Sequence, residues 1–243
     1  MASVIGVLLL GLSIKFFLKQ QKIFYDESAG TQVRASGRIA LNMLAKELRK
    51  AGYGFPGGQG ITTANNTTIT IRSNTDNVST WLASEITEGS TTSFTVRDAG
   101  NFSAADKIVL FNTSTSAWET AVIDSVNMGT DTITVTSALT NSYATSVPNM
   151  VSKYHDIVYA LDNANNMITK TVDGGAAMTV TEDIANNGLD FDYYDSANAE
   201  ITTMPSATPS NIRKIEIKLD MLDENNSDAT VSLETEVNLR NMG

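Results

Sequence analysis

Apolar side chains crowd the beginning of the chain, and they predict one end of a long helix. Residues 1–14 (MASVIGVLLLGLSI) carry no charge. The apolar positions are Val4, Ile5, Gly6, Val7, Leu8, Leu9, Leu10, Gly11, Leu12 and Ile14, followed after Lys15 by Phe16 and Phe17. A membrane-spanning helix needs about 20 apolar residues, so this run is short for a complete span.

The pattern then changes to that of an amphipathic helix. Apolar or small residues recur at steps of three and four, which places them on one helix face: Val33, Gly37, Ala40, Leu41, Leu44 and Leu48. We expect Val33, Leu41, Leu44 and Leu48 to pack on the rest of the protein. Gly52, Gly54 and Pro56 supply a stop signal. A helix of about fifty residues is roughly 75 Å long, so its apolar end needs a partner outside its own head.

Past residue 53 the pattern favours β-strands. In residues 214–221 and 231–239 apolar and polar positions alternate, which predicts a hairpin with one buried and one wet face. A shorter hairpin is predicted over residues 157–171. The predicted fold class is therefore α+β, with a long N-terminal helix (residues 1–53) packed on an antiparallel β-sheet head (residues 54–243). Residues 93–148 have their own strands and turns and are predicted to form a β-rich insertion.

Charge and cysteine content narrow the function classes. Residues 1–50 hold eight basic and three acidic side chains, whereas residues 51–243 hold nine basic and 24 acidic ones. A net charge of −15 on the head argues against nucleic acid as a partner, because phosphates are repelled. There are no cysteines, which excludes disulfides and thiolate chemistry.

Residues that carry chemistry are few. The chain has one histidine, His155, and a lone histidine is more often structural than catalytic. Asp190, Asp192 and Asp195 form a weak calcium candidate without the spacing of an EF-hand loop, and a solvated strand is the simpler interpretation. No phosphate-binding loop, nucleophile elbow or histidine-rich metal pattern is present. We expect a protein that is not an enzyme and holds no cofactor.

The helix carries a resemblance to a known family. Its elements are Gln20 and Gln21, Arg38, the leucine-rich turn of residues 41–48, and the ending Leu48-Arg49-Lys50-Ala51-Gly52-Tyr53. In this it resembles the N-terminal helix of type IV pilin-like proteins, specifically the PilW type of minor pilin. Residues 237–241 (VNLRN) are similar to the last strand of that family.

One part of the family pattern is missing. Members have a processing site and then a glutamate in the first turn of the apolar helix, whereas no glutamate precedes Glu27 here. Aligned on the other elements, the chain lacks about seven residues at the front, and seven more would give the length of a membrane span. Three interpretations stay open: the sequence begins inside the mature helix, the protein begins at Met1 without the glutamate, or the helix is a different membrane anchor.

The resemblance implies a function and partners. We expect a structural subunit of a type IV pilus-like filament that polymerises through its helix with further copies and with other pilins. Before assembly it would lie in the bacterial inner membrane with the pilus assembly machinery, and afterwards in an extracellular surface filament. Alternatives are a minor pilin or type II secretion pseudopilin that primes assembly, and a membrane-tethered adhesin or sugar-binding module.

Overall fold

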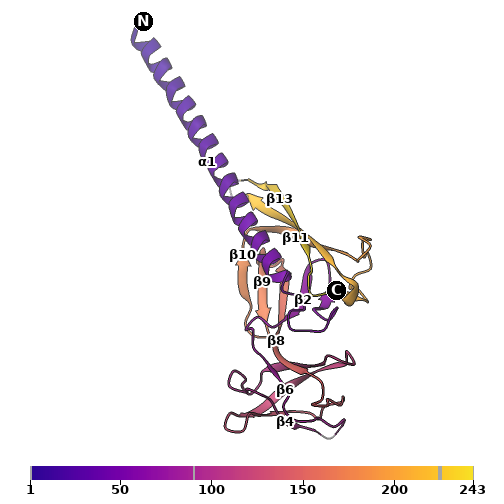
Figure 1. Ribbon diagram of the computed structural model, residues 1–243. Helices are drawn as coiled ribbons and strands as arrows, with labels where there is room; N and C mark the ends of the chain where they lie inside the picture. The colour runs from indigo at the N-terminus through magenta and orange to yellow at the C-terminus, as the bar shows by residue number, and fades with distance from the viewer. Residues whose placement is uncertain (1, 90, 224–225, 243) are drawn as a thin grey trace.

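A single long helix leads into a β-rich head. The computed structural model describes residues 2–89, 91–223 and 226–242, with the backbone alone for residues 2–9, 26, 29, 223 and 226–229. Helix α1 (Ala2–Leu48) has 47 residues, and its N-terminal part projects from the head as an isolated rod (Figure 1). The helix is followed by Gly52 and Gly54, both at positive φ, a backbone conformation that glycine adopts without steric cost. The Gly52 N–H donates to the Arg72 carbonyl at 2.8 Å, which ties the end of the helix to the head.

In the described part of the chain, ten strands form the larger of two antiparallel sheets. Their order is β1-β2-β8-β5-β6-β7-β4, with β3 and β9 also paired to β8, and β10 paired to β9. The strands are β1 (Ile61–Ala64), β2 (Thr68–Ser73), β3 (Ser79–Trp81), β4 (Ser93–Thr95), β5 (Lys107–Asn112), β6 (Trp118–Asn127), β7 (Thr132–Val135), β8 (Asn149–Asp162), β9 (Met167–Val172) and β10 (Met178–Thr181).

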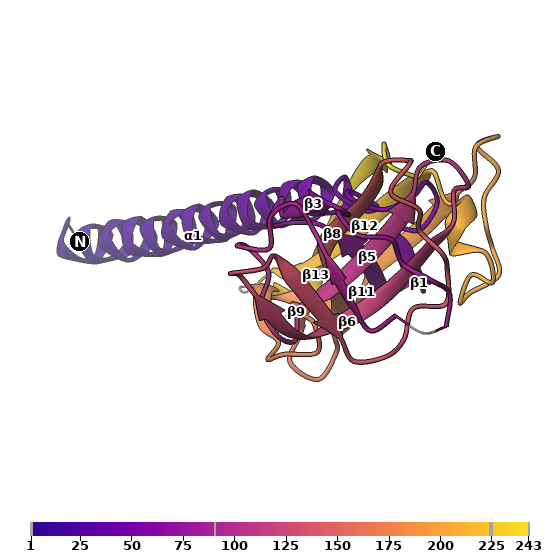
Figure 2. The ribbon, with the colours of Figure 1, turned by 60° about the horizontal axis from the view of Figure 1, so that its bottom comes forward.

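Strand β8 links the two parts of this sheet, because it pairs with strands in both. Its first half pairs with β3 and β5, and its second half, from His155 onward, pairs with β2 and β9. Figure 1 shows β2 and β9 in the end of the head nearer the helix, and β6 and β4 at the end that lies farthest from the helix N-terminus. We call the part formed by β3 to β7 and the first half of β8 the distal lobe. Figure 2 shows the same strands from below, with α1 extending to one side.

A second sheet of three strands covers the helix. It consists of β11 (Ile184–Tyr194), β12 (Lys214–Asp223) and β13 (Asn226–Asn238), all antiparallel, and a short 3-10 helix (Pro209–Asn211) precedes β12. The end of α1 packs against β12, β13 and β10. The α+β class predicted from the sequence is confirmed at this level, with one N-terminal helix and antiparallel sheets.

The head contains two separate hydrophobic cores. The first joins the end of α1 to both sheets, and it includes Leu44, Ile71, Tyr159 and Phe191, all fully buried. The second lies within the distal lobe and takes its buried residues from Leu82 to Val151. This second core begins some ten residues before the predicted insertion of residues 93–148, because Leu82 and Ile86 contribute to it.

Candidate assembly surface on helix α1

The described side chains in the N-terminal part of α1 are left uncovered by the part of the chain that the structure describes. Every described side chain from Leu10 to Ser28 is exposed. Leu10, Phe16 and Phe17 are each 65% exposed and Phe24 is 70% exposed. Burying a leucine or phenylalanine side chain contributes roughly 1.5–3 kcal/mol, so the exposed run forgoes a large stabilisation.

The apolar side chains cover most of the helix circumference rather than one narrow stripe, and the remaining face carries Lys15, Lys19 and Lys22. Residues 16, 17 and 18 are consecutive, and successive helical residues are rotated by about 100°, so Phe16, Phe17 and Leu18 point in three directions. Leu12 and Ile14, also exposed, extend the same surface toward the N-terminus. A helix that is apolar all round is normally buried on all sides. This segment is therefore suited to a position in which several partners surround it.

Sequence-predicted residues nearer the N-terminus are only partly described. Residues 4–9, which include Val4, Ile5, Gly6, Val7, Leu8 and Leu9, lie in α1, but their side chains fall outside the described part of the structure. At Gly11 an added Cβ would meet no atom within 4 Å. Among the described residues, therefore, no contact requires a glycine at position 11.

The C-terminal half of the helix lies on the head. Val33, Leu41, Leu44 and Leu48, the four residues expected to pack there, are buried in the first core. Among the helix glycines whose surroundings are described, Gly37 is packed most tightly, because a Cβ there would overlap Cδ1 of Leu233 and lie 3.1 Å from Cγ of Met221. Gly37 therefore lets the helix approach β12 and β13 closely.

The sequence analysis missed a second exposed patch on this half. Ile39 is 69% exposed and Met43 is 40% exposed, although their neighbours Ala40 and Leu44 are buried. Their four-residue spacing places Ile39 and Met43 on one face, which was the available signal. These two side chains extend the exposed apolar surface along the helix to the head.

Basic side chains interrupt the apolar surface. Lys15, Lys19, Lys22, Arg34 and Arg38 are all exposed. Within the described residues, no helix has a stretch long and apolar enough to cross a membrane.

The calcium candidates do not gather into a metal site. Asp192 pairs with Lys218 at 2.6 Å, and Asp190 accepts a hydrogen bond from the Asn66 side-chain amide at 3.1 Å. Asp195 accepts from the backbone N–H groups of Ala197 and Ala199 and so shapes its own turn. Among the residues that the structure describes, no three acidic or histidine side chains are arranged to hold a metal ion.

The single histidine lies in a group of charged residues between the two cores. His155 Nδ1 is 2.5 Å from Asp173 Oδ2, and its Nε2 is 3.0 Å from Asp76 Oδ2. Only a doubly protonated ring donates from both nitrogens. Ion pairs extend from these carboxylates to further side chains, and together they form what we call the charged band: Arg72, Asp76, Asp106, Lys107, Lys153, His155, Asp156 and Asp173.

The side chains of the charged band are arranged as ion pairs that hold strands together rather than as a reactive site. Partial burial by itself would lower the pKa of His155, but the two hydrogen bonds to carboxylates outweigh it and raise this pKa above its ordinary value. The same contacts lower the pKa values of Asp76 and Asp173. Each member is paired with opposite charge, so the band joins β2, β5, β8 and the end of β9 where the two cores meet.

Comparisons with known proteins identify no family. No family model and no curated protein matches the chain. Among solved structures, the chain is similar to the Gp54 tailspike of Acinetobacter baumannii bacteriophage AP22, solved in complex with A. baumannii capsular saccharide, at 20% identity. The match covers 39% of this chain and 15% of the tailspike, with a TM-score of 0.29. A likeness of this size carries no argument about fold or function.

Proposed function

We propose that this chain is a structural subunit of a type IV pilus-like filament and polymerises through α1. The observation that carries the proposal is the helix segment from Leu10 to Tyr25, which is rich in large apolar side chains and exposed on all sides. One flat interface covers only one face of a helix, whereas a bundle of helices covers all of them. Further copies of this chain, and other pilins, supply such a bundle.

The proposed mechanism is an exchange of apolar surroundings. Before assembly the apolar segment lies in the bacterial inner membrane, where the pilus assembly machinery acts on it. In the extracellular filament the same segment lies among the helices of neighbouring subunits. Because both surroundings are apolar, the transfer need not expose the segment to water.

The first experiment is electron microscopy of the fraction sheared from the cell surface, with mass spectrometry of the intact subunit. We expect filaments that contain this chain. Abundant chain identifies the main subunit, and trace amounts at filament tips identify a minor pilin. A chain that never leaves the membrane, or is absent from the surface fraction, contradicts the proposal.

A matched pair of variants tests the helix directly. Leu12 in α1 and Met128 in the β6–β7 turn are exposed to nearly the same extent, 64% and 63%. We expect Leu12→Arg to abolish filaments, because an unpaired charge in an apolar bundle costs several kcal/mol. Met128→Arg should leave filaments intact. Filaments of normal abundance from Leu12→Arg, at equal protein levels, would show that α1 is not the assembly surface.

A further inference from the structure

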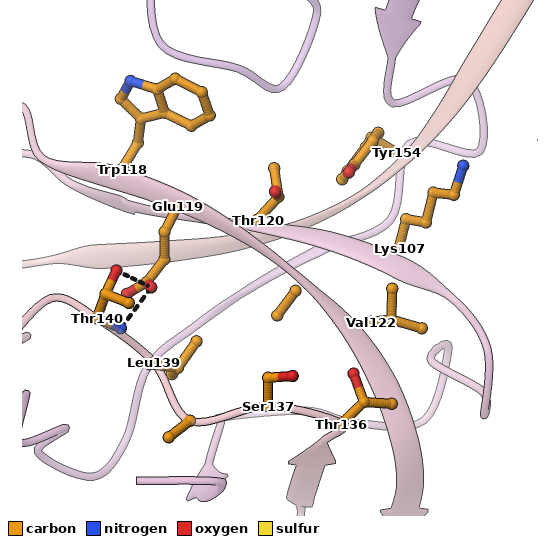
Figure 3. Close-up of a pocket in the computed structure, with 12 residues that line it drawn as sticks. Lys107, Trp118, Glu119, Thr120, Val122, Thr136, Ser137, Leu139, Thr140 and Tyr154 are labelled. Atoms are coloured by element: carbon orange, nitrogen blue, oxygen red, sulfur yellow. Dashed lines mark hydrogen bonds between the residues drawn. The ribbon is translucent and has the colours of Figure 1, made fainter. Parts of the chain in front are cut away.

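A hollow opens on the distal lobe, away from the helix. Its volume is about 600 Å³, within the range of small-molecule sites. It is formed by the first half of β6, by residues 136–140 after β7, and by Lys107 and Tyr154 of the adjoining strands (Figure 3). Strand β6 lies at the end of the head farthest from the N-terminus of α1 (Figure 1).

The path of the chain explains why the hollow exists. Strand β7 pairs with β6 only along residues 123–127. Residues 118–122 of β6 pair with β5 on one edge, and among the described residues no strand pairs with their other edge. The chain after β7 is hydrogen-bonded to β6 at both ends of this stretch. The Thr136 N–H donates to the Val122 carbonyl at 3.0 Å, and the Thr140 N–H donates to Glu119 Oε2 at 2.7 Å. The hollow lies between these two ties.

Aromatic rings and hydroxyl groups line the hollow together. Trp118 is half-buried at the rim, and the Tyr154 ring is buried and packs against Phe55 with ring centroids 4.8 Å apart. Figure 3 shows Trp118, Thr120 and Tyr154 on one side of the β6 ribbon, and Ser137 on the segment facing it. Hydroxyl groups both donate and accept hydrogen bonds, and they come from Thr120, Thr136 and Ser137.

The two charged side chains that line the hollow, Glu119 and Lys107, already have partners within the chain. Glu119 accepts from the Thr140 hydroxyl at 2.9 Å and from the Asn141 N–H at 3.1 Å, in addition to the Thr140 N–H. Lys107 Nζ is paired with Asp156 at 2.7 Å and Asp173 at 2.9 Å, both in the charged band. An anionic ligand would therefore find no unpaired positive charge in the hollow, and both carboxylate oxygens of Glu119 already accept hydrogen bonds. A neutral ligand rich in hydroxyls needs no counter-charge.

We propose that this hollow binds a neutral saccharide. The exposed part of the Trp118 ring offers a flat apolar surface to the C–H face of a sugar ring, and the hydroxyls and the open edge of β6 match its hydroxyl groups. A peptide added as a strand is the competing class. The open edge between the ties consists of Thr120 and Ala121, about 7 Å, which is too short for strand addition.

The chain offers a matched pair of tryptophans for the test. Its two tryptophans are Trp118 and Trp81, both in the distal lobe, and Trp81 is 41% exposed on β3. The full-length chain would be kept in a phosphocholine detergent, which has no sugar headgroup. In the Trp81→Phe variant, titration with cellohexaose, maltohexaose and N-acetylchitohexaose should give a saturable change in Trp118 fluorescence with at least one of them.

Calorimetric measurement of saccharide affinity in variants then tests whether the saccharide binds in this hollow. We expect Trp118→Ala to weaken binding at least about tenfold, while Trp81→Ala leaves it unchanged. Ser137→Ala, at an exposed position, should weaken binding severalfold without affecting folding, which keeps the test valid if Trp118→Ala unfolds. Binding that is unchanged in Ser137→Ala and Trp118→Ala, or no saturable binding up to about 10 mM, overturns the proposal. Capture of an extended peptide without any saccharide also overturns it. The chain is dispersed in detergent, so these results do not depend on filament assembly.

Discussion

His155 couples the stability of the head to pH, because both of its ring nitrogens face carboxylates. Its pKa is raised above 6.5, so its contribution to stability is complete below pH 6.5 and is lost as the pH rises through the raised value. We expect the urea concentration at the midpoint of unfolding to fall as the pH rises from 6.5 through the raised pKa of His155. The measurement is a series of unfolding curves from about pH 5 to about pH 9. The His155→Gln variant should lack this pH-dependent fall, and an equal fall in both proteins would assign it to other groups.

The carboxylates beside His155 lose their stabilising effect as the pH falls, whereas His155 loses its effect as the pH rises. Hydrogen bonds from His155 and Lys153 lower the pKa of Asp76, and at Asp173 those from His155 and Lys107 outweigh the effect of burial. Groups with lowered pKa values stabilise the head above their ordinary value of 3.8 and lose this effect as the pH falls through the lowered values. The charged band thus contributes fully between pH 3.8 and pH 6.5.

Gly37 is the residue whose size most directly limits helix packing. We expect Gly37→Leu to reduce the free energy of unfolding by about 1–3 kcal/mol, because the added side chain overlaps Leu233 and Met221. Gly30 provides the matched control, since a Cβ there meets no atom within 4 Å. Gly30→Leu should be neutral or stabilising by up to about 1 kcal/mol through helix propensity. Thermal unfolding in detergent compares the two, and equal losses would contradict the packing argument.

At the scale of the element, α1 is held on the head by one narrow stripe. Leu44 is fully buried in the first core, whereas Met43 is exposed on the other side of the same turn. We expect Leu44→Ala to cost about 2–5 kcal/mol of unfolding free energy and Met43→Ala less than about 0.5 kcal/mol. Urea unfolding of both variants measures the difference. Similar costs at the two positions would mean that α1 is not seated on the head as described.

How much the sequence predicts differs between the elements. The long helix and the β12–β13 hairpin follow from local periodicity, since each apolar position is repeated at the spacing of its element. Strands β1, β3 and β10, of three or four residues, escaped prediction because so short a run shows little periodicity. The equally short β4 and β7 lie within residues 93–148, which were predicted to contain strands. The spacing of Ile39 and Met43 shows that they share a helix face, but Ile39 was missed because only the position of the head shows that this face is exposed.

The candidate sites depend still more on tertiary contacts. His155 was recognised as a lone histidine, but its partners Asp76 and Asp173 are 79 and 18 residues away in sequence. The hollow needs Glu119 to meet Thr140, which are 21 residues apart. Nothing in the local sequence links such pairs, so neither the charged band nor the hollow could be predicted.

At the scale of the whole molecule, the two cores are joined by β8 and separated by the charged band. Ile133 is fully buried in the distal lobe, and Ile217 is fully buried in the first core. We expect Ile133→Ala to cost about 2–5 kcal/mol, and this loss should be confined to the distal lobe because the cores share no buried residue.

Hydrogen exchange distinguishes local from global opening in these variants. Ile133→Ala should accelerate exchange in β5, β6 and β7 and leave β11 to β13 protected, whereas Ile217→Ala should accelerate exchange in β11 to β13. Faster exchange throughout the head in both variants would show that β8 transmits the loss and that the head unfolds as one unit. Separate responses would mean that the distal lobe can change its surface, including the hollow on β6, while the packing that holds α1 on the head is preserved.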